Sequence, residues 1–176
     1  MNADLRALIR VVPNYPVAGV QFRDITTLLC NGAGFAASIE RLAAHVGPAP
    51  DLIAGIEARG FVFGAALAHK LGCGLVLLRK PNKLPGRVLG VDYDLEYGQD
   101  RIEMHADAVT PGTRVLLVDD LIATGGTALA GLSLLQSAGA VVDRAAFVID
   151  LPDLGGAGRL RAKAVDVTTL MSFSGH

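Results

Sequence analysis

Apolar residues recur every three or four positions in four parts of the chain, a spacing that places them on one face of a helix. Proline or glycine follows each of these segments and predicts where the helix stops. Short, wholly apolar runs lie between them, and such runs are typical of strands buried in a sheet. The expected helices cover residues 3–12, 35–46, 60–71 and 126–137, and the expected strands cover residues 52–56, 75–78, 114–118 and 141–149, with a β-rich segment at 164–173.

Because strands alternate with helices, the pattern predicts an α/β fold, a parallel β-sheet flanked by helices on both faces. Ligands in such sheets bind at the carboxyl ends of the strands. Residues 79–105 differ from the rest, since they hold ten charged residues, two prolines and alternating apolar positions at 88–93. This segment is predicted to form a hairpin-like excursion outside the main core.

The composition is typical of a single folded globular domain. The 176 residues are 51% hydrophobic and 19% charged, which excludes disorder and suffices for a single domain over residues 1–176. The net charge of −1 shows no excess of positive charge of the kind that nucleic-acid binding requires. Cys30 and Cys73 form no spaced pair, residues 1–12 do not read as a signal peptide, and no apolar run approaches the roughly 20 residues of a membrane span. We therefore expect a cytoplasmic protein that does not contact membranes.

The most informative segment begins with the apolar run at 115–118, which delivers two adjacent carboxylates, Asp119 and Asp120, to its carboxyl end. Vicinal hydroxyls of a ribose need paired acceptors, and ionised carboxylates only accept hydrogen bonds. The Thr-Gly-Gly-Thr turn at 124–127 then opens a helix, where converging N–H groups attract an anion. No lysine follows, as it would in a loop for a triphosphate, so the turn suits a terminal monophosphate.

This array resembles the signature of the type I phosphoribosyltransferases, which bind 5-phosphoribosyl-1-diphosphate. The resemblance implies the type I phosphoribosyltransferase fold, with a small flexible hood at about 79–105. It also implies that Asp119 and Asp120 lie near the ribose hydroxyls. The residues implied around the 5′-phosphate are Ala123, Thr124, Gly125, Gly126 and Thr127.

A second candidate anion site follows the strand predicted at 52–56. Arg59 carries a charged fork suited to phosphate oxygens, and Gly60 permits close approach of the backbone. An arginine after a strand is often merely solvated, but its occurrence together with the first loop favours a diphosphate site. The run from Glu57 through Ala58 to Gly60 resembles the pyrophosphate loop of adenine phosphoribosyltransferases, and the implied ligand is the diphosphate.

The hood segment carries two further motifs of that family. The cations at 79–86 form an R-K-x-x-K-L-P-G pattern, for which a solvated charged loop is the plain alternative. The resemblance implies that Arg79 or Lys83 contacts the diphosphate, often across a homodimer interface. It further implies that Glu96 lies over the reacting base as the candidate for proton transfer, with Tyr97 beside it in the hood.

The expected base is adenine. The loop at 14–26 resembles the adenine-binding segment, where Phe22 and the backbone of Arg23 would meet the purine and Leu151 would cover its other face. A 6-oxopurine is usually met by a lysine on the strand after the phosphate helix, and residues 145–151 hold no basic side chain. Adenine offers amino donors, which backbone carbonyls accept.

Together the motifs imply that adenine and 5-phosphoribosyl-1-diphosphate give AMP and pyrophosphate, in purine salvage. The implied cofactor is Mg²⁺, held mainly by the substrate and not by a protein metal site. One alternative is a transferase for xanthine, guanine or orotate. The absence of a lysine at 145–151 argues against guanine, and argues only weakly against xanthine and orotate. The other is a non-catalytic regulator that senses the donor, against which the complete hood argues.

Overall fold

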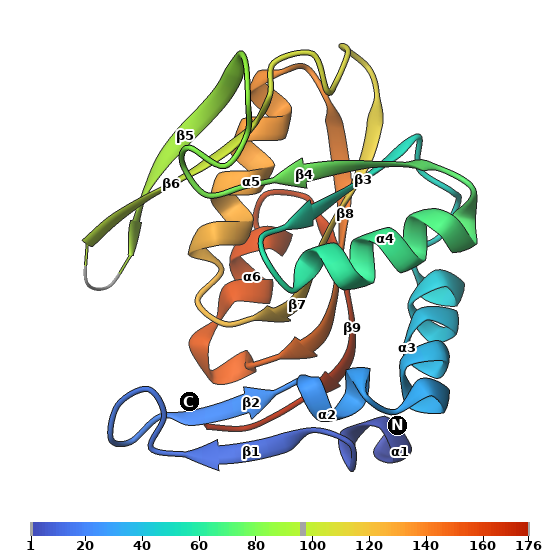
Figure 1. The fold of residues 1–176 in the computed structure, drawn as a ribbon, viewed down its shortest axis with the longest axis vertical. Coiled ribbons are helices and arrows are strands. Elements are labelled where there is room, and N and C mark those ends of the chain that lie inside the picture. The colour runs from blue at the N-terminus through green and yellow to red at the C-terminus, as the bar shows by residue number, and fades with distance from the viewer. Residues whose placement is uncertain (1, 96–97, 176) are drawn as a thin grey trace.

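The computed structural model describes residues 2–95 and 98–175. Its centre is a sheet of five parallel strands in the order β4-β3-β7-β8-β9 (Figure 1). The predicted parallel sheet and α/β class are thereby confirmed. The strands are β3 (Leu52–Ile56), β4 (Gly74–Leu78), β7 (Arg114–Ile122), β8 (Val141–Asp150) and β9 (Asp166–Ser172).

Both faces of the sheet are covered by helices, and residues 115–118 of the central strand β7 show why this run is wholly apolar. Val115 and Leu117 pack in one core cluster, whereas Leu116 and Val118 pack in the other. Successive side chains of a strand point to opposite faces, so a strand buried on both sides needs apolar residues at every position. The covering helices are α3 (Gly32–His45) and α4 (Gly60–Leu71) on one face, and α5 (Gly126–Ser137) and α6 (Gly156–Arg161) on the other.

Helices α3, α4 and α5 confirm three of the predicted helices. The side chain of Asn31 accepts a hydrogen bond from Gly34 N and so caps the start of α3. Helix α4 ends at Gly72, whose φ of +69° is the left-handed conformation that glycine adopts without strain. None of the helices in the described part of the chain has the length and apolar character needed to cross a membrane.

The helix predicted over residues 3–12 is wrong beyond its first turn. Helix α1 (Ala3–Arg6) ends early, and the chain continues as strand β1 (Arg10–Pro13). This strand pairs antiparallel with β2 (Gln21–Asp24), which lies in a segment expected to be a loop, and the short helix α2 (Thr26–Leu29) follows. Figure 1 shows this small layer at one end of the sheet, with the C-terminus beside β2.

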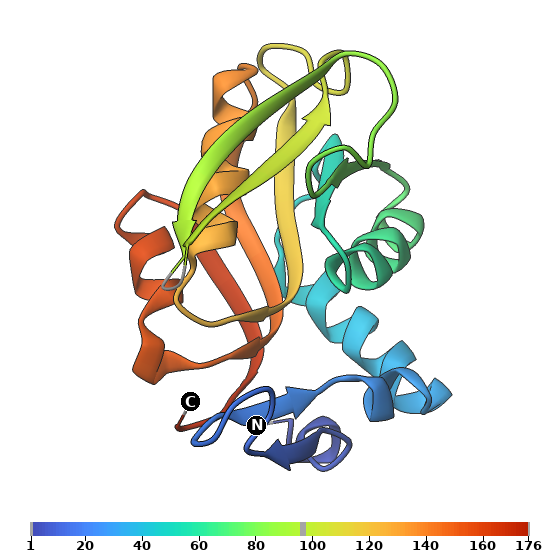
Figure 2. The ribbon, with the colours of Figure 1, turned by 60° about the vertical axis from the view of Figure 1, so that its left-hand side comes forward.

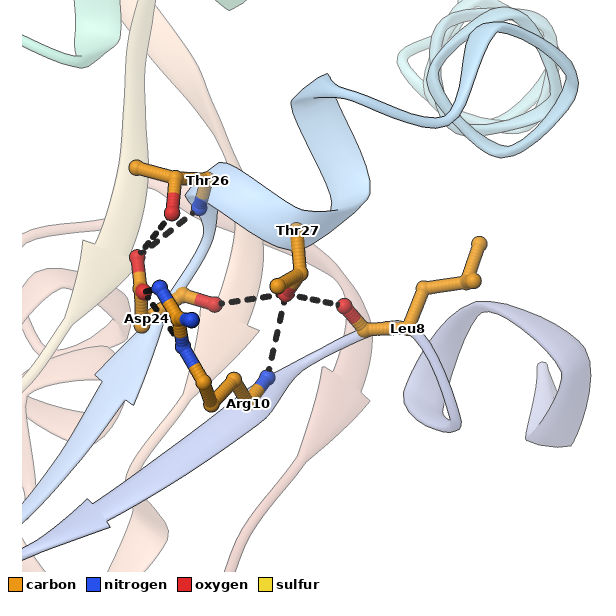
Figure 3. A network of polar contacts seen from close by, with 5 residues as sticks. All are labelled: Leu8, Arg10, Asp24, Thr26 and Thr27. Atoms are coloured by element: carbon orange, nitrogen blue, oxygen red, sulfur yellow. Dashed lines mark hydrogen bonds and ion pairs between the residues drawn. The ribbon is translucent and has the colours of Figure 1, made fainter.

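A side-chain network explains why the first helix stops (Figure 3). The hydroxyl of Thr27 donates to the carbonyl of Leu8 at 2.5 Å and accepts from the backbone N–H of Arg10 at 3.2 Å. A continuing helix would use these two backbone groups internally. The Asp24 carboxylate pairs with the Arg10 guanidinium and accepts from Thr26, so the competing structure also gains an ion pair.

Strands β5 (Val88–Leu95) and β6 (Gly98–His105) form the antiparallel hairpin that the sequence predicts. The expectation that it stands outside the main core is wrong for β6. Ile102 and Met104 are fully buried in the cluster that also holds the inner face of α5. Figure 2 shows the hairpin lying along α5, because alternate apolar residues of β6 pack inward.

The structure also differs from expectation at the carboxyl ends of β7 and β8. Strand β7 does not stop at Val118 but continues to Ile122, since the pairs Asp119–Phe147 and Leu121–Ile149 extend its ladder with β8. After β8 the chain forms a 3-10 turn (Pro152–Leu154) and helix α6, neither of which was predicted. Both extensions shape the candidate site.

Candidate functional site

The two predicted anion loops meet at one edge of the sheet. They follow β3 and β7, which are neighbouring parallel strands with Gly55 opposite Val118. The contact between the loops is close, because a Cβ added at Gly60 would lie 2.8 Å from Val118 O and 2.9 Å from Asp119 Oδ1. Only glycine fits at this position. The Glu57–Ala58 peptide bond, one residue before Arg59, is cis.

The turn after β7 forms a small pocket at the start of α5. Gly125, with φ of +82°, occupies the N-cap position of the helix, so the backbone turns sharply there. The cavity has a volume of about 130 Å³, roughly that of four water molecules, which is enough for one small anion. Its lining contains all five residues predicted around the 5′-phosphate, together with Asp119, Leu121, Ile122 and Ala128.

The two adjacent carboxylates lie within β7, so their side chains start toward opposite faces. Asp120 is only 3% exposed, and Arg59 Nε lies 2.7 Å from its Oδ2. This contact is an ion pair without hydrogen-bond geometry, so Oδ2 has no hydrogen-bond donor among the described residues. Asp119 Oδ1 accepts from the backbone N–H of Asp120 at 2.8 Å. Burial and then the Asp120 charge raise the pKa of Asp119 well above its usual 3.8.

The raised pKa of Asp119 has a measurable consequence for stability. A carboxyl that folding makes less acidic binds its proton more tightly in the folded chain, so stability is lost as pH rises from 3.8 through the folded pKa. Asp119→Asn removes this loss. We expect its Tm without ligand to exceed that of the unmodified chain at pH 7 by at least about 2 °C, with the difference vanishing below pH 3.8.

Thermal unfolding followed between pH 3 and pH 8 tests this expectation. Asp143→Asn is the matched control, because Asp143 is an exposed strand aspartate with 64% of its side chain accessible. Its unfolding curve should keep the pH dependence of the unmodified chain. If the Tm of Asp119→Asn at pH 7 stays at or below that of the unmodified chain, ionised Asp119 does not destabilise the folded protein.

Glu57 ties the second loop to the segment that follows β4. Its carboxylate accepts from the Arg79 guanidinium twice, at 3.2 Å each, and from the backbone N–H of Lys80 at 2.8 Å. The hydrogen bonds from Arg79 lower the pKa of Glu57. Arg79 Nη1 also donates to the carbonyl of Lys83, whose side chain is exposed. The predicted diphosphate residues are therefore gathered in one place, with Glu57 and Arg79 paired to each other.

The predicted base residues lie beside Arg59 and at the end of β8. Phe22 is half-buried, and the guanidinium of Arg59 lies 5.6 Å from its ring centroid. Arg23 is buried, donates to Ser174 O at 2.9 Å and lies over the Phe173 ring. Burial lowers the pKa of Arg23. Leu151 is buried in the same core cluster as Phe173. Arg59 thus links the base segment to the carboxylates.

Several residues that contact the candidate site were not predicted. Gly156 N donates to Ala123 O at 2.9 Å, and Arg159 donates to Thr124 O at 3.0 Å, so α6 supports the turn from behind. The Gly-Gly pair at 155–156, which follows the 3-10 turn after β8, is the sequence signal that could have indicated this close approach. On the hood side, the Thr127 hydroxyl donates to the Tyr93 hydroxyl at 3.3 Å. Predicted residues Glu96 and Tyr97 lie outside the described residues.

Comparison with known proteins assigns this arrangement to a family. The model of the phosphoribosyl transferase domain matches residues 24–173. An adenine phosphoribosyltransferase of Erythrobacter litoralis is 58% identical over 175 residues, which cover 98% of each chain. The crystal structure of the enzyme of that name from Thermoanaerobacter pseudethanolicus is 46% identical with a TM-score of 0.92, over 97% of this chain and 98% of the other.

A third relative was crystallised with ligands. The adenine phosphoribosyltransferase of Saccharomyces cerevisiae, complexed with adenine and an imino-altritol bisphosphate, is 36% identical with a TM-score of 0.90, over 96% of this chain and 97% of the other. The fold, the two loops at one sheet edge and these nearly full-length similarities agree. The chain belongs to the phosphoribosyl transferase domain family and, within it, to the adenine phosphoribosyltransferases.

Proposed function

We propose that this chain is an enzyme that transfers the phosphoribosyl group of 5-phosphoribosyl-1-diphosphate to adenine, giving AMP and pyrophosphate in purine salvage. One observation carries the proposal. Arg59 pairs with Asp120 on one side and lies over Phe22 on the other, between the two anion loops. Ribose, diphosphate and base groups therefore have neighbouring sites in the order that the donor and acceptor require.

The ribose end of the donor would occupy the loop after β7. Backbone N–H groups at 123–127 converge at the N-terminus of α5 and would hold the 5′-phosphate. The ribose hydroxyls would donate to Asp119 and Asp120, and the Asp120 oxygen that lacks a hydrogen-bond donor is a ready acceptor. A sugar held at both ends is aligned for attack at C1, which lowers the entropic part of the barrier.

The reaction forms the bond from adenine N9 to ribose C1 as the bond from C1 to the diphosphate oxygen breaks. Arg59, with Arg79 and Lys83 from the hood segment, would stabilise the charge that develops on the leaving diphosphate. The N9 proton of adenine must leave during this step, and Glu96 stays our prediction for the group that receives it. Closure of the hood over the site would exclude water and suppress hydrolysis of the donor.

Adenine would stack on Phe22, with Leu151 on its other face and the backbone of Arg23 meeting its edge. The half-buried ring of Phe22 supports this, as does the position of Leu151 directly after β8. The last residues of β8 include no lysine or arginine that would favour a 6-oxopurine carbonyl. The yeast relative, crystallised with adenine, supports the same base.

Mg²⁺ is proposed as the cofactor, bound mainly through the diphosphate and ribose oxygens of the donor. It would neutralise phosphate charge as a hard cation that prefers oxygen ligands. Asp119 and Asp120 supply oxygen atoms of the right chemical kind beside the proposed ribose position. Across residues 2–95 and 98–175, no group of three His, Cys, Asp or Glu side chains is placed to hold a metal.

We further propose a cytoplasmic homodimer. Exposed apolar side chains on α4, β4 and β5 (Val62, Leu77 and Leu89) support an interface near the edge of the sheet formed by β4. There the exposed Lys83 could reach a partner subunit. Cys30 and Cys73 are free thiols, which fits a reducing compartment.

Product analysis tests the function. The protein is mixed with 5-phosphoribosyl-1-diphosphate, Mg²⁺ and one base at a time, and the nucleotides are separated and identified. We expect AMP from adenine and no product from guanine, xanthine, hypoxanthine or orotate. Product from another base instead of adenine would overturn the base assignment, and donor binding without any product would replace the enzyme by a sensor of the donor.

A further inference from the structure

A polar cluster joins the hood hairpin to the loop that would hold the 5′-phosphate. Its members are Lys80, Tyr93, Asp100 and Thr127. The Tyr93 hydroxyl donates to Asp100 Oδ2 at 3.0 Å and accepts from Lys80 Nζ at 3.0 Å, while Lys80 also forms an ion pair with Asp100. The Thr127 hydroxyl completes the cluster by donating to Tyr93 at 3.3 Å. Three separate parts of the chain therefore meet at one phenol.

The same cluster reaches the other anion loop. The backbone N–H of Lys80 donates to the Glu57 carboxylate at 2.8 Å, and the side chain of Lys80 ends at Tyr93. A continuous path of polar contacts thus runs from Glu57, in the proposed diphosphate loop, to Thr127, in the proposed 5′-phosphate loop. The path passes through the hood, which makes the hood a second link between the two phosphate sites, beside the direct contact of the loops.

Lys80 and Asp100 in this cluster are both charged at neutral pH. Burial alone would lower the pKa of Lys80, but hydrogen bonds to Asp100 and Tyr93 outweigh it and raise the pKa. Burial would raise the pKa of Asp100, yet the hydrogen bond from Lys80 lowers it. The hairpin backbone also lies near the loop, since a Cβ added at Gly126 would be 3.7 Å from Asp94 O.

Proton counting shows how a bound phosphate would act on this cluster. A threonine hydroxyl has one proton, and that of Thr127 is directed to Tyr93 in this structure. A phosphate in the loop would accept the same proton. The contact between the two hydroxyls then survives only if Tyr93 rotates its own proton from Asp100 to Thr127, and Asp100 still keeps the donation from Lys80.

We infer that Tyr93 is a positioning residue that couples the placement of the hood to occupancy of the 5′-phosphate loop through the Thr127 hydroxyl. The inference rests on the proposed function of that loop. Tyr93 does not touch the reacting atoms. Its role is to keep the hood, and with it Lys80 and the Glu57 loop, in register with a donor whose 5′-phosphate is bound.

The test is a double-mutant cycle of Tyr93→Phe and Thr127→Val, read as KM for 5-phosphoribosyl-1-diphosphate and for adenine. Tyr93→Phe keeps the ring and removes only the hydroxyl. We expect its KM for the donor to rise about tenfold, the loss of one hydrogen bond, with the KM for adenine unchanged. In the double variant the donor KM should stay within about twofold of that of Thr127→Val alone, since both changes remove the same contact.

Thr110→Val is the control for loss of a hydroxyl, because this exposed side chain contacts Thr113 outside the cluster, and its donor KM should match the unmodified chain. Thermal unfolding of each variant checks that the fold is kept. If the unmodified chain makes AMP but Tyr93→Phe leaves the donor KM unchanged, or if the two effects simply multiply, the coupling is wrong while the proposed function stands. Absence of AMP from the unmodified chain would instead contradict the proposed function.

Discussion

Replacing Gly156 with alanine is expected to raise the KM for 5-phosphoribosyl-1-diphosphate by about a hundredfold or more. The added Cβ would lie 2.3 Å from Ala123 O and 2.7 Å from Gly125 N, and real Cβ atoms do not approach backbone that closely. Because both contacts are backbone atoms of the proposed 5′-phosphate loop, relief requires the loop to move. A shift of a fraction of an ångström would misdirect the N–H groups that bind the phosphate. Initial rates at saturating adenine measure the effect.

Helix α6 itself supplies the control. A Cβ at Gly158, two residues further on, meets no atom within 4 Å. Gly158→Ala should therefore keep the donor KM and, by lowering the entropy of the unfolded chain, stabilise the protein slightly. Gly156→Ala with an unchanged donor KM and an unchanged Tm would show that the loop does not depend on α6.

Removing the guanidinium of Arg59 is the second change with a large expected effect. Arg59→Ala should lower kcat/KM for 5-phosphoribosyl-1-diphosphate about a hundredfold. The change removes a charged group whose N–H bonds would stabilise the leaving diphosphate. The change also leaves the buried Asp120 without its countercharge beside Asp119. Arg59→Lys restores charge without the planar fork and should recover only part of the loss. Steady-state kinetics with varied donor, together with direct titration of pyrophosphate binding, measure both.

Arg114→Ala is the matched arginine control. Arg114 lies at the opposite end of β7 and pairs with Asp51, and both side chains are about half exposed. Exposed pairs contribute little to stability, so kinetics and pyrophosphate binding should match the unmodified chain. Equal losses in the two arginine variants would indicate a general effect of arginine removal and contradict a specific role for Arg59.

The sequence was a good guide wherever local pattern and global packing agree. Helices α3, α4 and α5 each have an apolar face and a glycine or proline stop, and the central strands each contain an apolar run that packs on both faces of the sheet. Local pattern failed where distant side chains decide the outcome. Thr27 takes the backbone groups that would have continued the first helix, and no periodicity in residues 3–12 reveals that competitor.

The candidate site divides in the same way. Its loops were predicted because each is a contiguous run with its own chemistry after a strand. The contacts that join the loops were not, since Tyr93 meets Thr127 only through the placement of the hairpin on α5. Helix α6 was missed because its six residues, Gly-Ala-Gly-Arg-Leu-Arg, are too few and too glycine-rich to show a period.

The close contact between Gly60 and β7 bears on which sugars the site accepts. Neighbouring strands are about 4.8 Å apart, and backbone hydrogen bonds hold β3 and β7 at that spacing. The two anion loops start from these strands and touch each other, so the gap between them is fixed by the sheet and cannot widen without breaking the ladder. We therefore expect the site to discriminate among donors by the distance between their two phosphate groups, because the sheet sets the spacing of the loops that would bind them.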